Sequence, residues 1–417
     1  MAAPKLRSND WFDSARFGMF VHWSPVSQRG WELSWPLVGG VGVLPHSHDA
    51  AVDDYYAKTL EFSPGPGAAR EWMSLARRAG MRYAVLTTKH HDGFAMWPTK
   101  LTDFSIASTP YEGDIVGEYV EAARAEGLRV GFYHSLSDWH HPDYPAFREE
   151  DKPYLSFLGR RSKTWDAYID VLFGQVRELL TNYGPVDLIW FDGQWERTAE
   201  EWRAAELASM IRELQPGILI NDRLSGEGDF TTPEQAMPAS TPTGRWETCM
   251  TMNRSWGYVP GDTEYKSATE LVHTLCEVAG KGGNLLLNVS PTADGSLPPE
   301  QVERITSVGE WMDRHAEAVH DTEAGLEPWQ FYGPSTRSDD RIFLVCPWRP
   351  YEHIVVRGLP VRRIEARHLA TGAELPVRTR LTAEQEITNP DPIGELVIEI
   401  APELVDPMAT VIELRTA

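Results

Sequence analysis

Residues 83–91 read YAVLTTKHH, a short apolar run that ends in a lysine and two histidines. Other runs of the same kind follow along the chain, and each ends in a polar or titratable residue. Their residues are 17–22, 129–133, 186–192, 218–223, 245–248 and 284–288. Short runs rich in β-branched and aromatic residues predict strands.

Helical patterns lie between these runs, and several of them end near a glycine, as helix C-termini often do. The clearest cover residues 67–79, 167–182, 199–215, 268–279 and 299–316. Strands that alternate with helices predict parallel pairing through right-handed crossovers. Seven strands over about 290 residues favour an α/β fold of the (β/α)8-like, TIM-type barrel kind, in which one strand or some helices are degenerate.

The pattern changes after about residue 325, where short β runs are separated by Pro, Gly and Asp. These runs are residues 341–346, 353–356, 362–367, 395–400 and 410–414. They predict a small C-terminal antiparallel β-sandwich. We therefore expect a barrel domain over residues 1–325 and a sandwich domain over residues 326–417, with the boundary between His320 and Trp329.

The composition excludes several classes of protein. Hydrophobic residues make up 42% and charged residues 24% of the 417 residues, which is typical of a globular chain and not of a disordered one. The net charge of −22 would repel phosphate backbones, so we expect no nucleic-acid partner. No stretch reaches the roughly 18 apolar residues of a membrane span, and the N-terminus lacks a signal-peptide core, so we expect no membrane partner and a cytoplasmic location.

The cysteines and the tryptophans are also informative. Cys249, Cys276 and Cys346 are far apart and never form a CxxC motif, which predicts three reduced thiols. The chain also has 16 tryptophans, more than packing usually requires, and their faces could bind the C–H face of a sugar.

In a (β/α)8 barrel the active site lies at the carboxyl ends of the strands, so residues placed there are the first candidates. One such residue alone could be a satisfied core group or a salt bridge, but every predicted strand ends in one. The candidates are His22, His90, His91, Tyr133, Asp192, Arg223, Glu247 and Asn288.

Three chemistries could use this set. A metal hydrolase needs three or four convergent ligands, and neighbours on a strand such as His90 and His91 should point to opposite faces. His46, His48 and Asp49 have ligand-like spacing, but they lie in a loop. A metal-dependent amidohydrolase-like barrel therefore stays an alternative, and we expect neither a metal nor another cofactor.

A serine nucleophile would need a GxSxG-like elbow, which the sequence lacks. The third chemistry uses a pair of carboxylates. Asp192 ends a predicted strand beside aromatic residues, and Glu234 or Glu247 is available downstream. Such a pair fits glycoside hydrolysis.

Six motifs then occur in order over roughly residues 10–320: residues 17–23 FGMFVHW, 89–94 KHHDGF, 190–193 WFDG, 221–223 NDR, 255–258 SWGY and 282–288 GGNLLLN. Together they resemble the α-L-fucosidases of glycoside hydrolase family 29. The resemblance implies a retaining exo-enzyme that releases terminal α-L-fucose from fucosylated oligosaccharides or glycoconjugates without a metal. A fucose-binding protein that has lost catalysis is the second alternative, although Asp192 and both glutamates are present.

The resemblance also assigns roles. Asp192 in WFDG corresponds to the family's nucleophile. The sugar-binding residues on matching motifs are His22, His90, His91, Tyr133, Trp190 and Arg223. The acid/base lies on a variable loop, and we prefer Glu234, 11 residues after Arg223, with Glu247 as the rival.

Some positions depart from the family pattern. Ser24 stands where the family often has Gly, and residues 288–291 read NVSP. The family's Glu-Trp pair is not reproduced as such in residues 31–35, WELSW. We assign Glu32 and Trp35 to that sugar contact, with Trp31 as the rival of Trp35. Other tryptophans should shape the pocket and the leaving-group site, namely Trp97, Trp139, Trp195 and Trp256.

Overall fold

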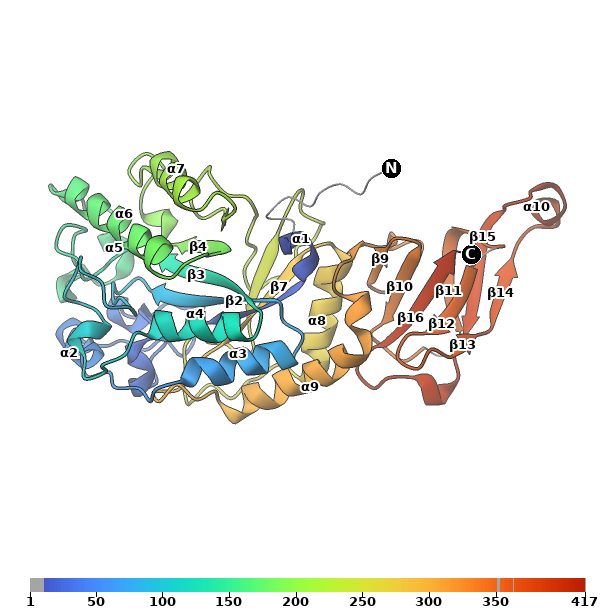
Figure 1. Cartoon of the computed structure of the whole chain (residues 1–417), viewed down its shortest axis with the longest axis horizontal. Helices are drawn as coiled ribbons and strands as arrows, with labels where there is room; N and C mark the ends of the chain where they lie inside the picture. The colour runs from blue at the N-terminus through green and yellow to red at the C-terminus, as the bar shows by residue number, and fades with distance from the viewer. Residues whose placement is uncertain (1–10, 351–352, 363, 417) are drawn as a thin grey trace.

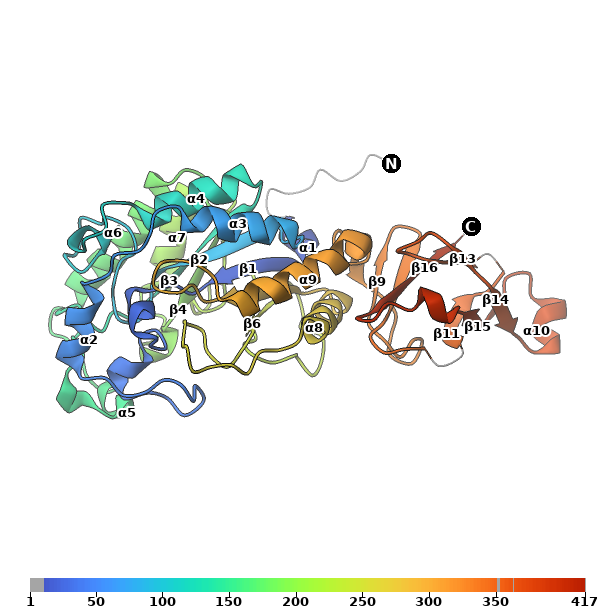
Figure 2. The same ribbon diagram turned by 90° about the horizontal axis from the view of Figure 1, so that it is seen from below.

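The structure is a computed structural model that describes residues 11–350, 353–362 and 364–416. A parallel sheet surrounded by helices lies at one end of an elongated molecule, and antiparallel sheets lie at the other (Figures 1 and 2).

The parallel sheet contains seven strands in the order β5-β4-β3-β2-β1-β7-β6. All seven correspond to predicted strands. They are β1 Phe17–Val21, β2 Tyr83–Lys89, β3 Arg129–Ser135, β4 Leu188–Asp192, β5 Leu219–Ile220, β6 Glu247–Thr251 and β7 Asn284–Val289. Every neighbouring pair is parallel, as the alternation of strands and helices predicts.

Three predicted strand ends are wrong. Strand β5 stops at Ile220, so Arg223 lies in the turn that follows it. Strand β2 stops at Lys89, so His90 and His91 lie in the following loop. Strand β6 begins at Glu247, which the prediction placed at its carboxyl end, and pairs Glu247 with Asn284, the first residue of β7. Glu247 therefore lies at the amino edge of the sheet.

Residues 229–235, which we call the closing segment, lie between the two edge strands β5 and β6. Isolated parallel bridges join Phe230 to Asn221 after β5, and Thr231 and Glu234 to Trp246 and Cys249. Backbone hydrogen bonds run from Asp229 N to Ile220 O and from Gln235 N to Cys249 O. The closing segment is thus the degenerate eighth strand, and it completes the barrel.

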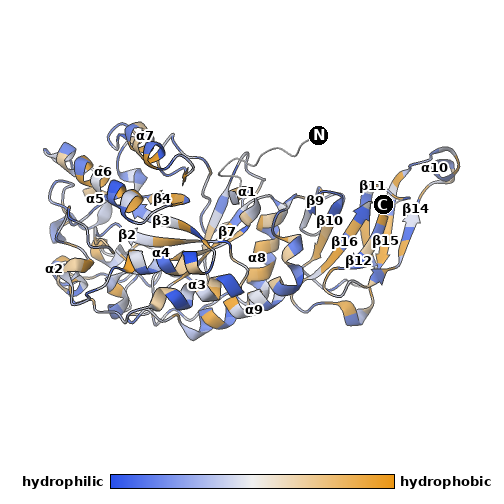
Figure 3. Ribbon diagram, viewed as in Figure 1, coloured by the Kyte–Doolittle hydropathy of each residue, from blue (hydrophilic) through white to orange (hydrophobic). Residues whose placement is uncertain are grey.

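Helices cover the outside of the barrel. The main ones are α3 Ala68–Arg78, α4 Ile115–Ala125, α6 Trp165–Asn182, α7 Ala204–Leu214, α8 Ala268–Gly280 and α9 Pro299–His315. Five of them confirm the predicted helices, although α7 begins five residues later than predicted. Helix α4 is additional, and the Asp114 side chain caps it by accepting a hydrogen bond from Gly117 N. Polar and apolar residues alternate along α6 and α9, which is typical of helices packed on a core (Figure 3).

Shorter helices lie in the loops that follow strands and in the N-terminal region. They are α1 Trp11–Ala15, α2 Val52–Thr59 and α5 Tyr154–Phe157. In the described part of the chain, no helix is long and apolar enough to cross a membrane.

The C-terminal region forms two antiparallel sheets, of order β13-β12-β16-β10-β9-β8 and β11-β15-β14. Their strands are β8 Glu323–Ala324, β9 Ser335–Ser338, β10 Arg341–Cys346, β11 His353–Pro360, β12 Ile364–His368, β13 Glu374–Leu375, β14 Val377–Arg380, β15 Ile393–Glu399 and β16 Thr410–Thr416. A short helix, α10 Ala383–Thr388, precedes β15. Buried residues such as Leu344, Val356 and Leu396 form a core of their own here, as expected for a sandwich. The division at residues 325 and 326 stays a proposal, since β8 precedes it but pairs with β9.

Candidate active site

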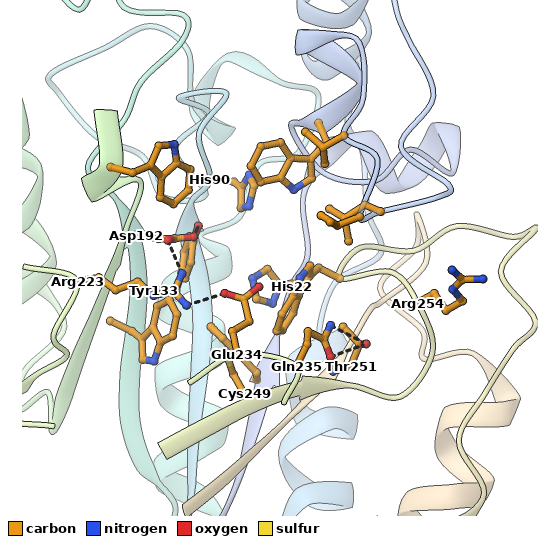
Figure 4. Close-up of a pocket in the computed structure, with 18 of the residues that line it drawn as sticks. His22, His90, Tyr133, Asp192, Arg223, Glu234, Gln235, Cys249, Thr251 and Arg254 are labelled. Atoms are coloured by element: carbon orange, nitrogen blue, oxygen red, sulfur yellow. Dashed lines mark hydrogen bonds and ion pairs between the residues drawn. The ribbon is translucent and has the colours of Figure 1, made fainter. Parts of the chain in front are cut away.

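A cavity of about 640 Å³ opens at the carboxyl ends of the barrel strands (Figure 4). Nine of the twelve residues predicted for the site line it: His22, Trp35, His90, Tyr133, Trp190, Asp192, Arg223, Glu234 and Trp256. The other three, Glu32, His91 and Glu247, lie outside its lining.

Asp192 is the last residue of β4 and is 8% exposed at the base of the cavity. Its Oδ2 accepts a hydrogen bond of 2.8 Å from the Tyr133 hydroxyl, and its Oδ1 accepts one of 2.7 Å from Arg223 Nη1. Burial by itself would raise the pKa of Asp192, but the charge of Arg223, the nearby His91 and these two hydrogen bonds outweigh it and lower the pKa. Asp192 is therefore a carboxylate over the whole neutral range.

Arg223 binds a second carboxylate with its other nitrogen. Nη2 donates to Glu234 Oε2 at 2.6 Å, while the guanidinium lies 4.5 Å from the centre of the Trp190 ring (Figure 4). Glu234 lies on the closing segment, and its side chain is 38% exposed. One cation thus holds Asp192, at the base of the cavity, and Glu234, which solvent reaches.

Three histidines surround Asp192 and the cavity, and each uses Nδ1 to bind a side chain of another loop or strand. His22 is 2.6 Å from Asn288 Oδ1, His90 is 2.6 Å from Ser34 Oγ and His91 is 2.7 Å from Ser135 Oγ. Burial lowers the pKa of all three, to about 4 for His22 and His91. All three rings are therefore neutral at pH 7 and offer one donor and one acceptor each.

The prediction that His90 and His91 point to opposite faces is wrong, because the strand ends before them. Their ring centres are 4.1 Å apart. His90 lines the cavity and stacks on Tyr133, while His91 Nε2 is 3.7 Å from Asp192 Oδ2. Both neighbours therefore serve the same site.

Aromatic side chains form the upper walls. Trp35 packs against His91 with ring centres 5.3 Å apart, and Trp256 packs against His22 at 5.0 Å. Trp195 lies at the rim and donates to the Tyr154 hydroxyl at 2.9 Å. Trp31, the rival of Trp35, stacks instead on Tyr55 and does not line the cavity. The other expected pocket residues, Trp97 and Trp139, are buried and do not line it either.

Glu32 does not line the cavity, although the sequence predicted it in the sugar contact. Its side chain is fully buried, and its carboxyl oxygens accept hydrogen bonds from the backbone N–H groups of Trp256, at 2.6 Å, and Gly257, at 2.9 Å. Burial raises its pKa to about 8 despite these two bonds. Glu32 therefore positions the loop that carries Trp256, and Trp35 alone of the assigned pair lines the cavity.

Glu247 lies beneath the site, inside the barrel. Its Oε1 accepts from Trp190 Nε1 at 3.1 Å, and its Oε2 accepts from the Tyr83 hydroxyl. Burial raises its pKa to about 7. Tyr83 passes so close to Gly18 that a Cβ there would lie 2.4 Å from the ring, which only glycine permits. The geometry thus separates Glu247 from the cavity and connects it to Trp190.

Several residues of the site were not predicted from the sequence. Ser34 and Ser135 hold His90 and His91, and Ser135 in turn accepts from Ser137 N. Gln235 and Thr251 bind each other at the rim (Figure 4). Serine is common in loops, and only the position of Ser135 at the end of β3 could have indicated its role. Apolar Val41, Val43 and Leu44 also line the mouth of the cavity.

The three cysteines are free, as predicted, and all three are buried. Cys249 forms part of the cavity wall. The ligand-like group does not converge: His46 Nε2 lies 3.6 Å from Asp262 Oδ1, while Asp49 binds Lys152. Among the described residues no group of three or more His, Cys, Asp or Glu side chains is arranged to hold a metal ion.

The sequence was compared with known proteins. The family model described as Alpha-L-fucosidase matches residues 3–317. The chain belongs to the α-L-fucosidase family. An α-L-fucosidase of Dictyostelium discoideum is 30% identical over 347 residues, which are 77% of this chain and 72% of that protein. The tissue α-L-fucosidase of Mus musculus is 32% identical over 340 residues, with the same coverage.

Solved α-L-fucosidase structures agree over the whole chain. Isoenzyme 1 from Paenibacillus thiaminolyticus has a TM-score of 0.87 and 37% identity and covers 99% of both chains. An α-L-fucosidase of Bacteroides thetaiotaomicron, solved as a trapped covalent intermediate, has a TM-score of 0.79 and 27% identity and covers 98% of this chain and 95% of that one. The predicted fold class, barrel followed by β-sandwich, is therefore that of α-L-fucosidases.

Proposed function

We propose that this chain is a retaining exo-α-L-fucosidase that hydrolyses terminal α-L-fucose from fucosylated glycans, with Asp192 as nucleophile and Glu234 as acid/base. One observation carries the assignment of roles: a single guanidinium, that of Arg223, binds both carboxylates at the cavity. Retaining glycosidases need two carboxyl groups about 5 to 5.5 Å apart and in unlike environments. Asp192 is buried and ionised, whereas solvent reaches Glu234, so the two environments differ.

In the first step Asp192 Oδ attacks the anomeric carbon from the face opposite the leaving group. The bond from that carbon to the glycosidic oxygen breaks, and protonated Glu234 gives its proton to the departing oxygen. The products are a free alcohol, a fucosyl ester on Asp192 and an ionised Glu234.

In the second step Glu234 takes a proton from water, whose oxygen attacks the same carbon. The ester bond breaks, and Asp192 leaves as a carboxylate. Two inversions give fucose of the original anomeric configuration. The covalent intermediate trapped in the B. thetaiotaomicron relative supports this course.

Other residues of the site fit the binding of the sugar. His22 can accept a hydroxyl hydrogen through Nε2, since its Nδ1–H donates to Asn288. His91 can present its Nε2–H to Asp192, because Ser135 O–H can donate to its Nδ1. Trp35 and Trp256 offer aromatic faces to the apolar side of fucose and its methyl group.

Glu247 takes a positioning role in this proposal instead of the acid/base role. It fixes the Trp190 indole by a hydrogen bond, and that indole carries the Arg223 guanidinium on its face. Glu247 thus positions Arg223, the cation that binds both catalytic carboxylates, indirectly through the Trp190 ring.

The nucleophile is tested with Asp192→Gly. Turnover should fall by about three orders of magnitude or more, because the covalent step is lost. Added azide should enter the space left by the side chain and restore partial cleavage of nitrophenyl α-L-fucoside, giving β-fucosyl azide by a single inversion. Formation of α-fucosyl azide, or full activity without azide, would overturn the role of Asp192.

A second measurement distinguishes the fucosidase from a metal-dependent hydrolase and from a fucose-binding protein. Activity should survive exhaustive chelation, and elemental analysis should show no stoichiometric metal. Zinc at one ion per chain, with activity lost on its removal, would favour an amidohydrolase-like mechanism. Fucose binding by the unmodified chain with no turnover of any fucoside would identify a binding protein instead.

A further inference from the structure

A second cavity, of about 460 Å³, lies where the barrel meets the C-terminal sheets. Helix α8 with Lys281 after it and residues 324–328 and 331–335 enclose most of it, and Thr241 and residues 347 and 348 complete it. None of its lining residues lines the cavity that contains Asp192. It is therefore a separate site, and it has no role in the proposed reaction.

The wall from the C-terminal region is aromatic. The rings of Tyr332 and Trp348 stack on each other with centres 5.6 Å apart and planes 25° apart. They are 45% and 53% exposed, whereas most large apolar side chains of the protein are buried. Paired, exposed aromatic faces of this kind are a recognised signature of a binding surface.

The wall from the barrel is polar. Glu277 and Lys281 lie on the last turn of α8 and just beyond it, and Lys281 Nζ donates to Glu277 Oε1 and to Pro238 O, both at 3.0 Å. The Glu277 side chain is 48% exposed, so its oxygens can accept further hydrogen bonds. His273, which also lines the cavity, is fixed by Met408 O at 2.8 Å.

The two walls are held in place without a ligand. Gly280 approaches Ser335 so closely that a Cβ there would meet the Ser335 backbone at 3.2 Å. Ser335 also accepts hydrogen bonds from Gly325 N and, through its hydroxyl, from Leu326 N. A site fixed in this way loses little entropy when it binds a ligand.

A ligand that fits both walls needs a flat apolar face and a rim of hydroxyl groups. A pyranose ring has this shape: its axial C–H groups form one face, and its hydroxyls point outward. We propose that this cavity binds a neutral hexopyranose unit of an oligosaccharide, stacked on Tyr332 and Trp348 and hydrogen-bonded to Glu277 and Lys281. This site would hold a glycan-bearing substrate to the enzyme and raise the local concentration of its fucosyl ends.

Binding is tested on the full chain by affinity electrophoresis in gels that contain xyloglucan, galactan, mucin or dextran. The unmodified protein should be retarded by at least one of these glycans, and Trp348→Ala should lose that retardation. Trp329→Ala is the matched control, since Trp329 is 63% exposed in the same region but does not line the cavity. Both replaced side chains are exposed, so we expect unchanged melting temperatures.

Tyr332→Ala provides an independent second variant. No retardation of the unmodified protein by any of the four glycans would overturn the proposal. Retardation of Trp348→Ala and Tyr332→Ala equal to that of the unmodified protein would overturn it as well. Retardation lost in Trp329→Ala but not in Trp348→Ala would overturn it as well, because the sugar would then bind elsewhere on the C-terminal region.

Kinetic measurements test whether the second cavity affects the cleavage of polymeric substrates. With nitrophenyl α-L-fucoside, kcat/KM should be the same for the unmodified protein, Trp348→Ala and Trp329→Ala. With a fucosylated polymer that retards the protein, Trp348→Ala should raise KM by about tenfold, while Trp329→Ala should not change it. Equal KM values for the polymer would overturn the tethering role. If no fucoside is cleaved, the proposed function is wrong, and the electrophoresis still tests whether the second cavity binds a sugar.

Discussion

Arg223 connects the two carboxyl groups of the free site. Its guanidinium is bonded to Asp192 at 2.7 Å and to Glu234 at 2.6 Å, and its charge helps to lower the pKa of Asp192. In the proposed mechanism Glu234 gives a proton to the departing oxygen when the glycosidic bond breaks.

The acid/base assignment can be tested through the leaving group. Glu234→Ala should reduce kcat/KM for a natural fucosyl disaccharide far more than for nitrophenyl fucoside, since nitrophenolate departs with little protonation. Azide should accelerate the remaining slow step with the aryl substrate and yield α-fucosyl azide by double inversion.

Glu247→Gln is the matched control, because it keeps the side-chain size beneath Trp190 but replaces one of the two oxygens that accept from Trp190 and Tyr83 by an NH2 group. It should lower kcat/KM for both substrates by a similar factor, about tenfold, with no azide rescue, as expected for lost positioning. The reverse pattern in the two variants would make Glu247 the acid/base.

At this scale the sequence was sufficient to place a residue at the cavity where a motif lies at or near a strand end, as at Asp192 and Tyr133, while Arg223 follows β5 by three residues. It was insufficient for Glu32 and Glu247, whose surroundings depend on distant partners. The donors to Glu32 lie 224 and 225 residues further along the chain. Only the packed structure shows that its carboxyl group serves the backbone of the Trp256 loop.

Among the elements, the closing segment has the greatest influence on the chemistry. It carries Glu234, and Phe230 within it is buried against Phe12 with ring centres 4.7 Å apart. The sequence did not identify it as a strand because Pro233 cannot donate a ladder hydrogen bond and Gln235 has a φ of 55°. Seven regular strands, in contrast, follow from apolar runs alone.

Hydrogen exchange can test whether the closing segment behaves as a strand. The amides of Thr231 and Gln235 donate to backbone carbonyls of the β6 side, at 3.0 and 2.9 Å. Within the described chain, no amide of residues 237–244 shows such a backbone bond. Peptides covering 229–235 should therefore exchange at least about tenfold more slowly than those covering 237–244. Equal rates would contradict the description of an eighth strand, and β2 provides the protected reference.

For the molecule as a whole, two buried carboxyl groups affect stability. The pKa of Glu32 is raised to about 8 and that of Glu247 to about 7, whereas an unfolded glutamate ionises near about 4.3. Between these values the folded protein holds more protons than the unfolded chain, so the free energy of unfolding falls as the pH rises. The lowered pKa of Asp192 acts only in more acidic solution. The buried His22 and His91, with pKa values of about 4, act in the opposite sense up to about pH 6.5, where an unfolded histidine loses its proton.

The effect of Glu247 is therefore read from the difference in melting temperature between pH 8 and pH 5.5, at constant ionic strength. In Glu247→Gln the change from pH 5.5 to pH 8 should be more positive than in the unmodified protein by about 2 °C or more, because the glutamine cannot ionise. Glu303→Gln removes one charge from a side chain that is 79% exposed, and should leave the difference unchanged. An identical pH dependence in the unmodified protein and Glu247→Gln would show that Glu247 ionises equally in both states.

The way the barrel closes also bears on how such enzymes diversify. An inserted residue within the regular ladder between β3 and β4 would reverse every following side chain and displace Asp192. The closing segment is held by isolated bridges, and its flanking stretches, residues 224–228 and 236–245, are loops in which added length costs little. Insertions and deletions there would move the proton donor relative to a stationary nucleophile. A lineage can thus acquire new leaving-group preferences by changing loop length, with the bond-forming half of the site inherited intact.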